Sequence, residues 1–395
     1  MSKRRYLESH PWLKFEVLNM RNASPKLWMM LGEAISKTFH IAGVPLMPDV
    51  AEEFSKLYLT KGAMATAAIE GNTLTEEEVR RRMDGDLDLP PSREYLGKEI
   101  DNILSECNRV AQEVYDGTHS KISVEEIKRF NKGIMNGLEM EDGAPGVIRH
   151  RGVGVGRYSG APPEDCEYLL GKMVAMLNSP SFEAKEGDEM LYGILKAIVA
   201  HIYFVWIHPF FDGNGRTARL IELKFLLQSG IPFPACHLLS NHYNLTRDKY
   251  YKELDRTSKG DFDILPFIEY SVSGFVDGLK EQLKKIRIIQ WELCWVNFIH
   301  EKFKDQNTEA QTRRRHLILD LSKDSRVEIP IKEIRMLTTR LVEHYSGKGF
   351  RTISRDLNQL VEMNLILKDS KHVVVLRQQI VAFLPVSAVG IMRLF

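Results

Sequence analysis

Apolar residues recur at every third or fourth position along most of the chain, which is the spacing of one face of an α-helix. This pattern predicts helices over residues 26–39, 51–69, 191–206, 220–227 and 262–285. A longer and more polar helix is expected over residues 279–303. The body of the protein is therefore predicted to be mainly α-helical.

Glycine and proline interrupt the helical pattern at residues 43–48, 89–92, 143–163 and 230–234. The longest interruption alternates Val153 and Val155 with glycines, which favours a β-hairpin; the alternative is an ordinary surface loop between helices. A loop of this length in a compact helical body is often functional. The segment is therefore a candidate for part of a functional site.

The pattern changes towards the C-terminus. Residues 331–345 and 350–363 have helical spacing, and the apolar residues 365–376 that follow end in a β-branched run. This order of helix, helix and hairpin predicts a separate small domain.

Composition adds limits to this picture. A chain of 395 residues with 44% apolar residues, 27% charged residues and a formal net charge of +1 is typical of a soluble protein of two or three domains. The charge offers no overall attraction to nucleic acid or to an anionic membrane. The apolar runs are shorter than the ~20 residues that span a bilayer. The basic N-terminus lacks an apolar segment, which favours the cytoplasm.

The four cysteines are widely separated and form no CxxC pair of the kind found in zinc or redox sites. They are expected to be small buried apolar residues. They are Cys107, Cys166, Cys236 and Cys294.

The sequence HPFFDGNGRTAR, residues 208–219, lies between two apolar helical runs. Gly213 and Gly215 flank Asn214 and permit positive φ angles, so that successive backbone N–H groups can point into one concave nest. The nest would lie at the start of the second helix, where the helix dipole also favours an anion. The alternative is that the segment is only a turn.

Charged side chains in the same segment favour the anion site. Arg216 and Arg219 are three residues apart on one helix face and suit a polyphosphate. Asp212 fits such a site as the ligand of a Mg²⁺ ion that bridges to the phosphates. His208 titrates near neutrality and can accept a proton from an attacking hydroxyl. A nucleotide-transfer reaction with His208 as general base is therefore predicted.

These residues fill every fixed position of the Fic motif, HPFx(D/E)GNGRxxR, and the chain resembles Fic-domain proteins. The resemblance implies that the histidine activates a target hydroxyl and that the acidic residue holds Mg²⁺. It also implies that the turn and the first arginine bind the α- and β-phosphates and the second arginine the γ-phosphate. The matching residues are His208, Pro209, Phe210, Asp212, Gly213, Asn214, Gly215, Arg216 and Arg219.

A wider resemblance covers two more parts of the chain. Pro145, Gly146, Arg149, Val153 and Gly154 are similar to the family's flap, a hairpin that holds an extended target segment by strand addition. The resemblance implies target contacts for the last three of these. More loosely, Asn244, Tyr250 and Tyr251 are similar to positions near the family's adenosine pocket, although a core role for the tyrosines is the alternative.

The sequence TAAIEGN, residues 66–72, places Thr66 and Glu70 on one helix face ahead of Gly71. On its own this is an ordinary helix end. It also matches the family's inhibitory pattern (S/T)xxxE(G/N). The resemblance implies that Glu70 pairs with Arg219 and denies that arginine to the γ-phosphate.

The C-terminal region resembles a winged helix-turn-helix domain. Residues 311–379 contain 14 Lys and Arg against 8 Asp and Glu, an excess that supports weak binding to nucleic acid. The alternative is a domain that mediates protein contacts. The polar face that suits a DNA groove carries Arg351, Thr352, Ser354, Arg355 and Asn358.

Together these observations predict a mainly α protein with a Fic helical core, a β-hairpin flap and a C-terminal winged helix-turn-helix domain. The expected divisions are an N-terminal helical region at 1–115, the core at 116–300 and the winged-helix domain at 310–395.

The expected activity is transfer of AMP from ATP, with Mg²⁺, to a Ser, Thr or Tyr hydroxyl of a protein. The alternatives are removal of AMP, another nucleotide donor, or a transcriptional regulator whose core senses nucleotide. ATP and a protein target are expected partners, a homodimer and DNA are further candidates, and no membrane partner is expected.

Overall fold

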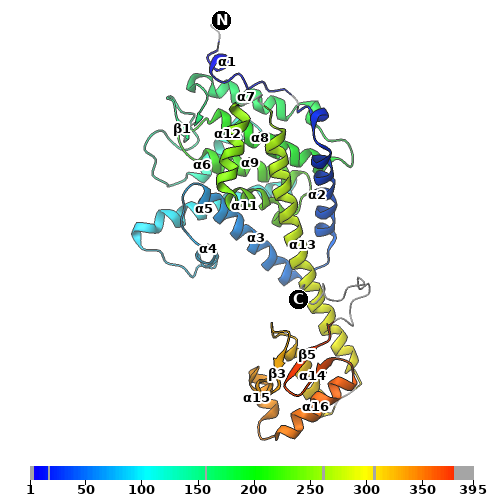
Figure 1. The fold of residues 1–395 in the computed structure, drawn as a ribbon. Coiled ribbons are helices and arrows are strands. Elements are labelled where there is room, and N and C mark those ends of the chain that lie inside the picture. The colour runs from blue at the N-terminus through cyan, green and yellow to red at the C-terminus, as the bar shows by residue number, and fades with distance from the viewer. Residues whose placement is uncertain (1–3, 17, 156–157, 260–262, 306–307, 378–395) are drawn as a thin grey trace. The chain divides into compact units, whose positions relative to one another are not determined.

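The structure is a computed structural model that describes the chain except for residues 1–3, 17, 156–157, 260–262, 306–307 and 378–395. The chain forms two compact units, Met1–Leu283 and Lys284–Phe395 (Figure 1). The first unit includes the predicted N-terminal region and most of the predicted core. The second includes the predicted C-terminal domain, of which residues 378–395 lie outside the described part.

The first unit is built mainly from helices. They are α1 (Tyr6–Ser9), α2 (Pro25–Gly43), α3 (Pro48–Ile69), α4 (Glu76–Met83), α5 (Glu94–Tyr115), α6 (Val124–Ile134), α7 (Cys166–Leu177), α8 (Glu189–Ile207), α9 (Asn214–Gln228), α10 (Phe233–Cys236), α11 (Leu238–Leu245), α12 (Arg247–Lys259) and α13 (Leu265–Lys302), which continues into the second unit. Short 3₁₀ turns lie at Met20–Asn22, Pro91–Arg93, Pro163–Asp165 and Pro180–Phe182.

Local sequence explains where several of these helices begin. The Ser24 hydroxyl accepts a hydrogen bond from the Leu27 N–H at the start of α2, and Ser123 caps α6 in the same way. At α4, Thr75 and Glu78 cap each other's backbone N–H groups in a capping box. Helices α2, α4 and α6 therefore begin at positions that the sequence itself specifies.

Helices α8 and α9 form the centre of the first unit and pack closely against each other (Figure 1). Helix α8 is 19 residues long with a mean hydropathy of 1.7 in its most apolar window, enough by length and composition to cross a membrane. The expectation that every apolar run is too short was therefore wrong. That window is 78% buried inside the protein, as in the core helix of a globular domain.

A two-stranded antiparallel sheet lies between α6 and α7. Strand β1 (Gly154–Val155) pairs with β2 (Tyr158–Ser159), with Gly154 opposite Ser159. This confirms strand structure in the segment 143–163, although residues 156 and 157 lie outside the described part. Below, "the flap" means residues 149–161.

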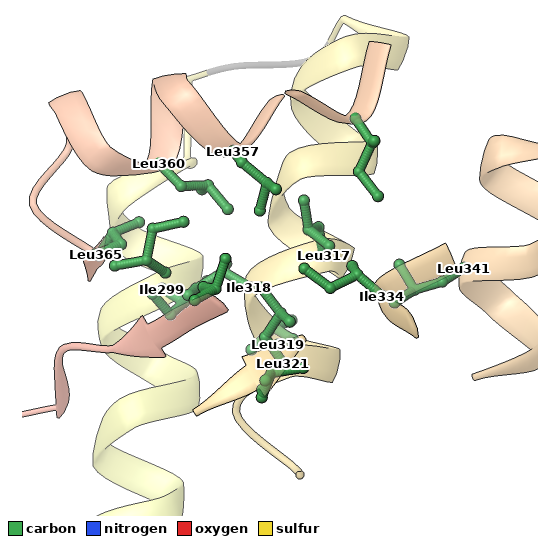
Figure 2. Packing of buried hydrophobic residues seen from close by; sticks show 14 of the residues in the cluster. Ile299, Leu317, Ile318, Leu319, Leu321, Ile334, Leu341, Leu357, Leu360 and Leu365 are labelled. Carbon is green, nitrogen blue, oxygen red and sulfur yellow. The ribbon is translucent and has the colours of Figure 1, made fainter. Parts of the chain in front are cut away.

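The second unit contains α14 (Glu309–Leu321), β3 (Ile329–Pro330), a 3₁₀ turn (Ile331–Met336), α15 (Thr339–Tyr345), α16 (Phe350–Glu362), β4 (Ile366–Lys368) and β5 (His372–Val375). Its strands form an antiparallel sheet in the order β3-β5-β4. Leu317, Ile334 and Leu357 belong to a buried apolar cluster that these elements share with the end of α13 (Figure 2). The unit therefore has a core of its own.

The structure differs from the pattern-based expectations in four details. Residues 331–345, predicted as one helix, form the 3₁₀ turn Ile331–Met336 and helix α15. The two helices predicted over 262–285 and 279–303 are the single helix α13, because Gly274 and Gly278 inside it do not break the apolar spacing; residue 262 lies outside the described part. Helix α9 begins at Asn214, six residues before the apolar spacing starts at 220 and two before Arg216, which was predicted to lie on the helix, because the turn itself supplies its first residues. Cys294 is exposed, whereas Cys107, Cys166 and Cys236 are buried as expected.

Candidate active site

Residues 208–215 form a tight turn between α8 and α9. His208 ends α8 in the left-handed conformation, with φ of 51°, and Pro209 prevents the helix from continuing. Gly213 is also left-handed, with φ of 75°. A side chain at Gly213 would lie only 2.7 Å from the Met135 sulfur, so glycine is required by both conformation and space.

Two asparagines hold this turn in shape. The Asn214 amide donates to the Phe210 carbonyl at 2.8 Å and accepts from the Phe210 N–H at 3.0 Å. Asn131, on α6, donates to the Asp212 carbonyl at 2.9 Å and accepts from the Gly146 N–H at 2.8 Å. The Asn214 side chain is therefore engaged within the turn, and its contribution to an anion site comes from its backbone N–H.

His208 carries its proton on the nitrogen that faces the protein. Its Nδ1 lies 3.3 Å from the Val205 carbonyl, which can only accept, so Nδ1 must donate and Nε2 is left without a proton in the neutral ring. Burial of the ring lowers its pKa from the ordinary 6.5 to about 4, and the nearby Arg149 charge acts in the same direction. His208 is therefore neutral at pH 7 and able to accept a proton at Nε2.

A pocket of about 620 Å³ opens beside His208, within the size range of small-molecule sites. It is lined by Ile69, Glu70, Val153, Gly154, Tyr158, Val205, Trp206, His208, Phe211, Asp212, Gly213, Asn214, Gly215, Tyr250, Tyr251, Lys252, Leu254 and Asp255. The structure thus gathers the end of α3, the flap, the turn 208–215 and α12 around one space. Asn244 is not among the described residues that line it.

Arg216 lies between two carboxylates. Its Nη1 contacts Glu99 Oε1 at 2.5 Å, and its Nη2 contacts Asp212 Oδ1 at 2.9 Å. Glu99, on α5, is buried and also accepts a hydrogen bond from the Asn72 side-chain amide at 2.8 Å. The first motif arginine is therefore fixed from outside the motif.

Arg219 pairs with Glu70. Its Nη2 lies 2.6 Å from Glu70 Oε1 and 3.0 Å from the Thr66 carbonyl. Burial alone would raise the pKa of the Glu70 carboxyl, but Arg219, with smaller contributions from Arg216 and His208, lowers that pKa below its ordinary value, so Glu70 is charged at neutral pH. The Glu70 carboxylate also lies directly over Gly215, where an added side chain would approach Oε1 to 2.0 Å.

Arg149 has a position different from the target contact that the resemblance implied. Its side chain is almost fully buried at 2% exposed, and Nε donates to the His208 carbonyl at 2.7 Å and Nη1 to the Arg151 carbonyl at 2.8 Å. Nη2 donates to the Ala161 carbonyl. Arg149 therefore joins both ends of the flap to the turn 208–215 and cannot face a target, whereas Val153 and Gly154 do line the pocket.

The two tyrosines of α12 differ in burial. Tyr250 is 3% exposed, and its hydroxyl lies 2.8 Å from His201 Nε2 in the core, so its ring lines the pocket while its hydroxyl is engaged elsewhere. Tyr251 is 38% exposed, and its hydroxyl donates to the Ile69 carbonyl at 3.4 Å. Tyr250 is therefore buried, as the core alternative predicted, whereas Tyr251 is not; both line the pocket, and a contact with adenosine stays a prediction.

The described residues contain no group of three or more His, Cys, Asp or Glu side chains that could hold a metal ion. Asp212 is one of the carboxylates at the pocket wall, with Glu70 and Asp255, and its side chain is 53% exposed. Mg²⁺ commonly binds proteins through one or two carboxylates plus phosphate oxygens. The residues present therefore fit a metal that enters with a nucleotide.

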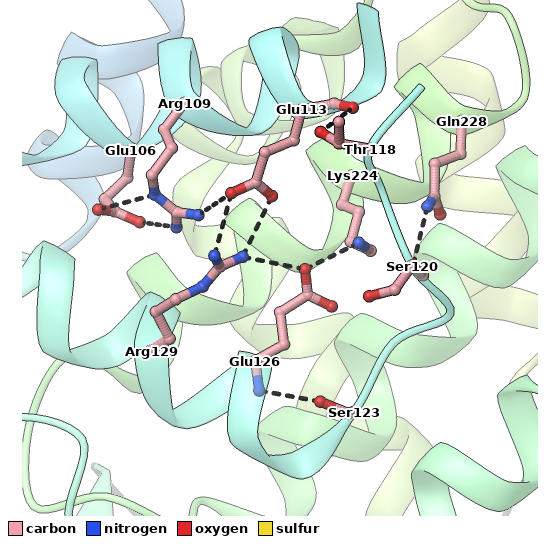
Figure 3. A network of polar contacts seen from close by, with 10 residues as sticks. All are labelled: Glu106, Arg109, Glu113, Thr118, Ser120, Ser123, Glu126, Arg129, Lys224 and Gln228. Atoms are coloured by element: carbon pink, nitrogen blue, oxygen red, sulfur yellow. Dashed lines mark hydrogen bonds and ion pairs between the residues drawn. The ribbon is translucent and has the colours of Figure 1, made fainter. Parts of the chain in front are cut away.

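A network of charged side chains joins α5, α6 and α9 behind this site (Figure 3). Lys224 on α9 pairs with Glu126 on α6 at 2.8 Å, and both side chains are buried. Arg129 links Glu126 to Glu113 on α5. These pairs connect α9 to α6 and α6 to α5.

Three residues that hold the site were missed from the sequence: Asn72, Glu99 and Asn131. Glu99 and Asn131 lie on amphipathic helices, where a single buried polar residue among charged neighbours gives no distinct signal. Asn72 belongs to the TAAIEGN segment, but its partner is 27 residues away. For Glu99 and Asn131, the only feature of the sequence that could have indicated a role is a polar residue on the otherwise apolar face of a helix.

Residues 121–226 match the Fic/DOC family model. This segment is therefore similar to the Fic/DOC domain, and it includes the turn 208–215 described above. The protein adenylyltransferase fic-1 of Caenorhabditis briggsae is 30% identical over 210 residues, which are 52% of this chain and 37% of that protein. The chain thus spans less than two fifths of the length of this curated relative.

Solved structures show the same fold. A Fic family protein from Desulfovibrio desulfuricans G20 is similar with a TM-score of 0.54 at 19% identity, covering 91% of this chain and 98% of that one. Fic-1 of C. elegans, residues 134–508, is similar with a TM-score of 0.52 at 23% identity, covering 65% of this chain and 71% of that one. At these identities the likeness concerns the fold alone.

Proposed function

We propose that the protein is an adenylyltransferase that moves AMP from ATP to a Ser, Thr or Tyr hydroxyl of a protein. The observation that carries the proposal is the pocket that His208, with its proton-free Nε2, lines together with Asp212 and the first residues of α9, Asn214 and Gly215. The names of the curated relatives point the same way, because they are protein adenylyltransferases.

In the proposed reaction, the target hydroxyl oxygen attacks the α-phosphorus of ATP while its proton passes to His208 Nε2. A new phosphorus–oxygen bond forms, the bond between the α-phosphorus and the bridging oxygen breaks, and pyrophosphate leaves with its electron pair. The backbone N–H groups at 213–215 and the Arg216 guanidinium stabilise the phosphate charge as it shifts. Most of the rate gain comes from positioning and electrostatics.

Mg²⁺ is part of this proposal, with Asp212 as the residue that would hold it against the phosphates. The ion supplies neutralisation of phosphate charge when it is bound. The fit rests on the half-exposed Asp212 carboxylate at the pocket wall.

We further infer that Glu70 inhibits the transfer. Its carboxylate occupies Arg219 and lies over Gly215, and a γ-phosphate brought to Arg219 would meet a like charge there. Arg219 Nε and Nη1 are buried without a hydrogen-bond partner among the described residues, so the guanidinium has unused donors for a phosphate. Displacement of Glu70 would make the Arg219 guanidinium available to the γ-phosphate.

The test is incorporation of labelled AMP from α-labelled ATP with Mg²⁺. The native chain is expected to incorporate little label. The Glu70→Gly variant is expected to incorporate at least tenfold more, and a factor of ten in rate corresponds to about 1.4 kcal/mol. The double variant with Glu70→Gly and His208→Ala is expected to incorporate no label above background. Label that persists in the double variant would exclude His208 as the base. Equal label in the native chain and the single variant would exclude inhibition by Glu70, and absence of label throughout would exclude ATP as the donor.

We also infer that the second unit is a winged helix-turn-helix domain. The order α14, β3, α15, α16, β4, β5, with a three-stranded antiparallel sheet, supports this inference. Binding of DNA, dimer formation and cytoplasmic location stay predictions from the sequence.

A further inference from the structure

Glu99 is a buried carboxylate in contact with a phosphate-binding arginine. It lies on α5, is 8% exposed, and contacts Arg216 Nη1 at 2.5 Å through one oxygen. Its other oxygen accepts a hydrogen bond from Asn72 Nδ2 at 2.8 Å, and the same amide donates to the Leu96 carbonyl at 3.0 Å. Both oxygens of Glu99 are therefore engaged, which fixes the carboxylate relative to Arg216.

Arg216 thus shares its charge between two carboxylates with different surroundings. The Glu99 side chain is 10% exposed, whereas that of Asp212 is 53% exposed and borders the pocket. The Arg216 side chain is itself only 6% exposed, so its charge needs a nearby counter-charge. If Glu99 were neutral, Asp212 would be the remaining partner in contact with Arg216.

We propose that Glu99 is a positioning residue that neutralises Arg216 from behind and so leaves the Asp212 carboxylate free for a metal-bound nucleotide. The inference rests on the proposed function, because it assumes that ATP and Mg²⁺ bind this pocket. The consequence concerns binding: loss of the Glu99 charge ties Asp212 more firmly to Arg216 and makes the pocket more positive. Metal-free ATP then binds more tightly, while the advantage that Mg²⁺ gives to ATP binding falls.

The same contact connects the phosphate site to the segment 66–72. Glu70 and Asn72 are two residues apart; the first pairs with Arg219 directly and the second reaches Arg216 through Glu99. Both motif arginines are therefore held from one short segment. This explains why a carboxylate 117 residues from Arg216 in the sequence is buried at this position.

The test measures ATP dissociation constants by titration calorimetry in the Glu70→Gly chain, once with excess Mg²⁺ and once with EDTA. The ratio of the EDTA value to the Mg²⁺ value is the Mg²⁺ advantage. Glu99→Gln is expected to lower this ratio by about fivefold or more, the lower end of typical coupling between sites. Glu99→Asp, which keeps the charge, is expected to retain most of the ratio.

Glu126→Gln is the matched control, because Glu126 is equally buried and pairs with Lys224 behind the site. It is expected to lower the melting temperature about as much as Glu99→Gln and to leave the ratio unchanged. If ATP still binds, an unchanged ratio in Glu99→Gln, or a fall in Glu126→Gln equal to that in Glu99→Gln, would overturn the proposed role of Glu99. Failure of every form to bind ATP would instead overturn the proposed function itself.

Discussion

His208, Arg216 and Arg219 are each held by a residue that lies outside the segment 208–219. His208 has its carbonyl bonded by Arg149, Arg216 contacts Glu99, and Arg219 contacts Glu70. A short motif supplies the reactive groups, but their orientation depends on partners that are 59, 117 and 149 residues away along the chain. Substitutions at these partners are therefore expected to change function without touching the motif.

The protonation of His208 gives a prediction about pH. Burial lowers its pKa to about 4, so the base form is already complete at pH 6 and is lost only as the pH falls through about 4. In the Glu70→Gly chain, kcat/KM for transfer is expected to stay flat from pH 8 to about 5. Removing Glu70 does not raise the pKa of His208, because the negative charge of Glu70 favours the protonated ring.

The measurement is labelled AMP incorporation at subsaturating target from pH 5 to 8, with circular dichroism at each pH to confirm that the chain stays folded. A fall in kcat/KM centred near 6.5, the ordinary value for histidine, would show that the ring is not buried in the active form.

At the scale of elements, the end of α3 is shaped by a glycine. Glu70 caps the helix, and Gly71 follows with φ of +105°, donating its N–H to the Ala68 carbonyl while the Asn72 N–H bonds the Ala67 carbonyl. This is the Schellman arrangement that commonly ends a helix at glycine. The helix end therefore fixes where Glu70 points.

Gly71→Ala is expected to weaken the proposed inhibition. A side chain at Gly71 would meet no atom within 4 Å, so its cost is conformational, about 1–3 kcal/mol for a residue held at positive φ. Relief of this strain unwinds the last turn of α3 and moves Glu70 from Arg219. AMP incorporation is expected to rise, though by less than in Glu70→Gly.

Gly117→Ala provides the control for that experiment. Gly117 follows α5 with φ of +66°, makes the same pair of helix-ending bonds, and would also meet nothing within 4 Å. It should lower the melting temperature by a comparable amount and leave incorporation unchanged. A rise in incorporation in both variants would attribute the effect to general destabilisation.

The helices could be predicted from the sequence, whereas the contacts between them could not. The apolar spacing of α2, α3 and α8 is a local property, and each was found with errors of a few residues at its ends, whereas α13 was predicted as two overlapping helices. The role of Arg149 was misplaced, because burial depends on α7, α8 and the flap closing around it. The motif residues were recognised from their spacing, but the partners that orient them lie on helices with unremarkable patterns.

At the scale of the whole molecule, the two units have separate apolar cores. The second unit buries its own cluster, which includes Leu317 and Leu357 at 0% exposed, from elements that begin at the C-terminal part of α13. The candidate site lies within residues of the first unit. Loss of packing in the second core is therefore expected to leave the geometry of the site intact.

Leu357→Ala tests this independence. Truncating a fully buried leucine costs about 2–5 kcal/mol through lost transfer energy and the cavity that remains. Hydrogen exchange is expected to quicken in α14, α16 and β5, which share that core, and to stay unchanged in α8 and α9. Calorimetry in the Glu70→Gly background should give the same dissociation constant for Mg²⁺-bound ATP with and without the substitution. Equal acceleration of exchange in α9 would mean that the two units unfold as one, because the continuous helix α13 would then transmit the destabilisation from one core to the other.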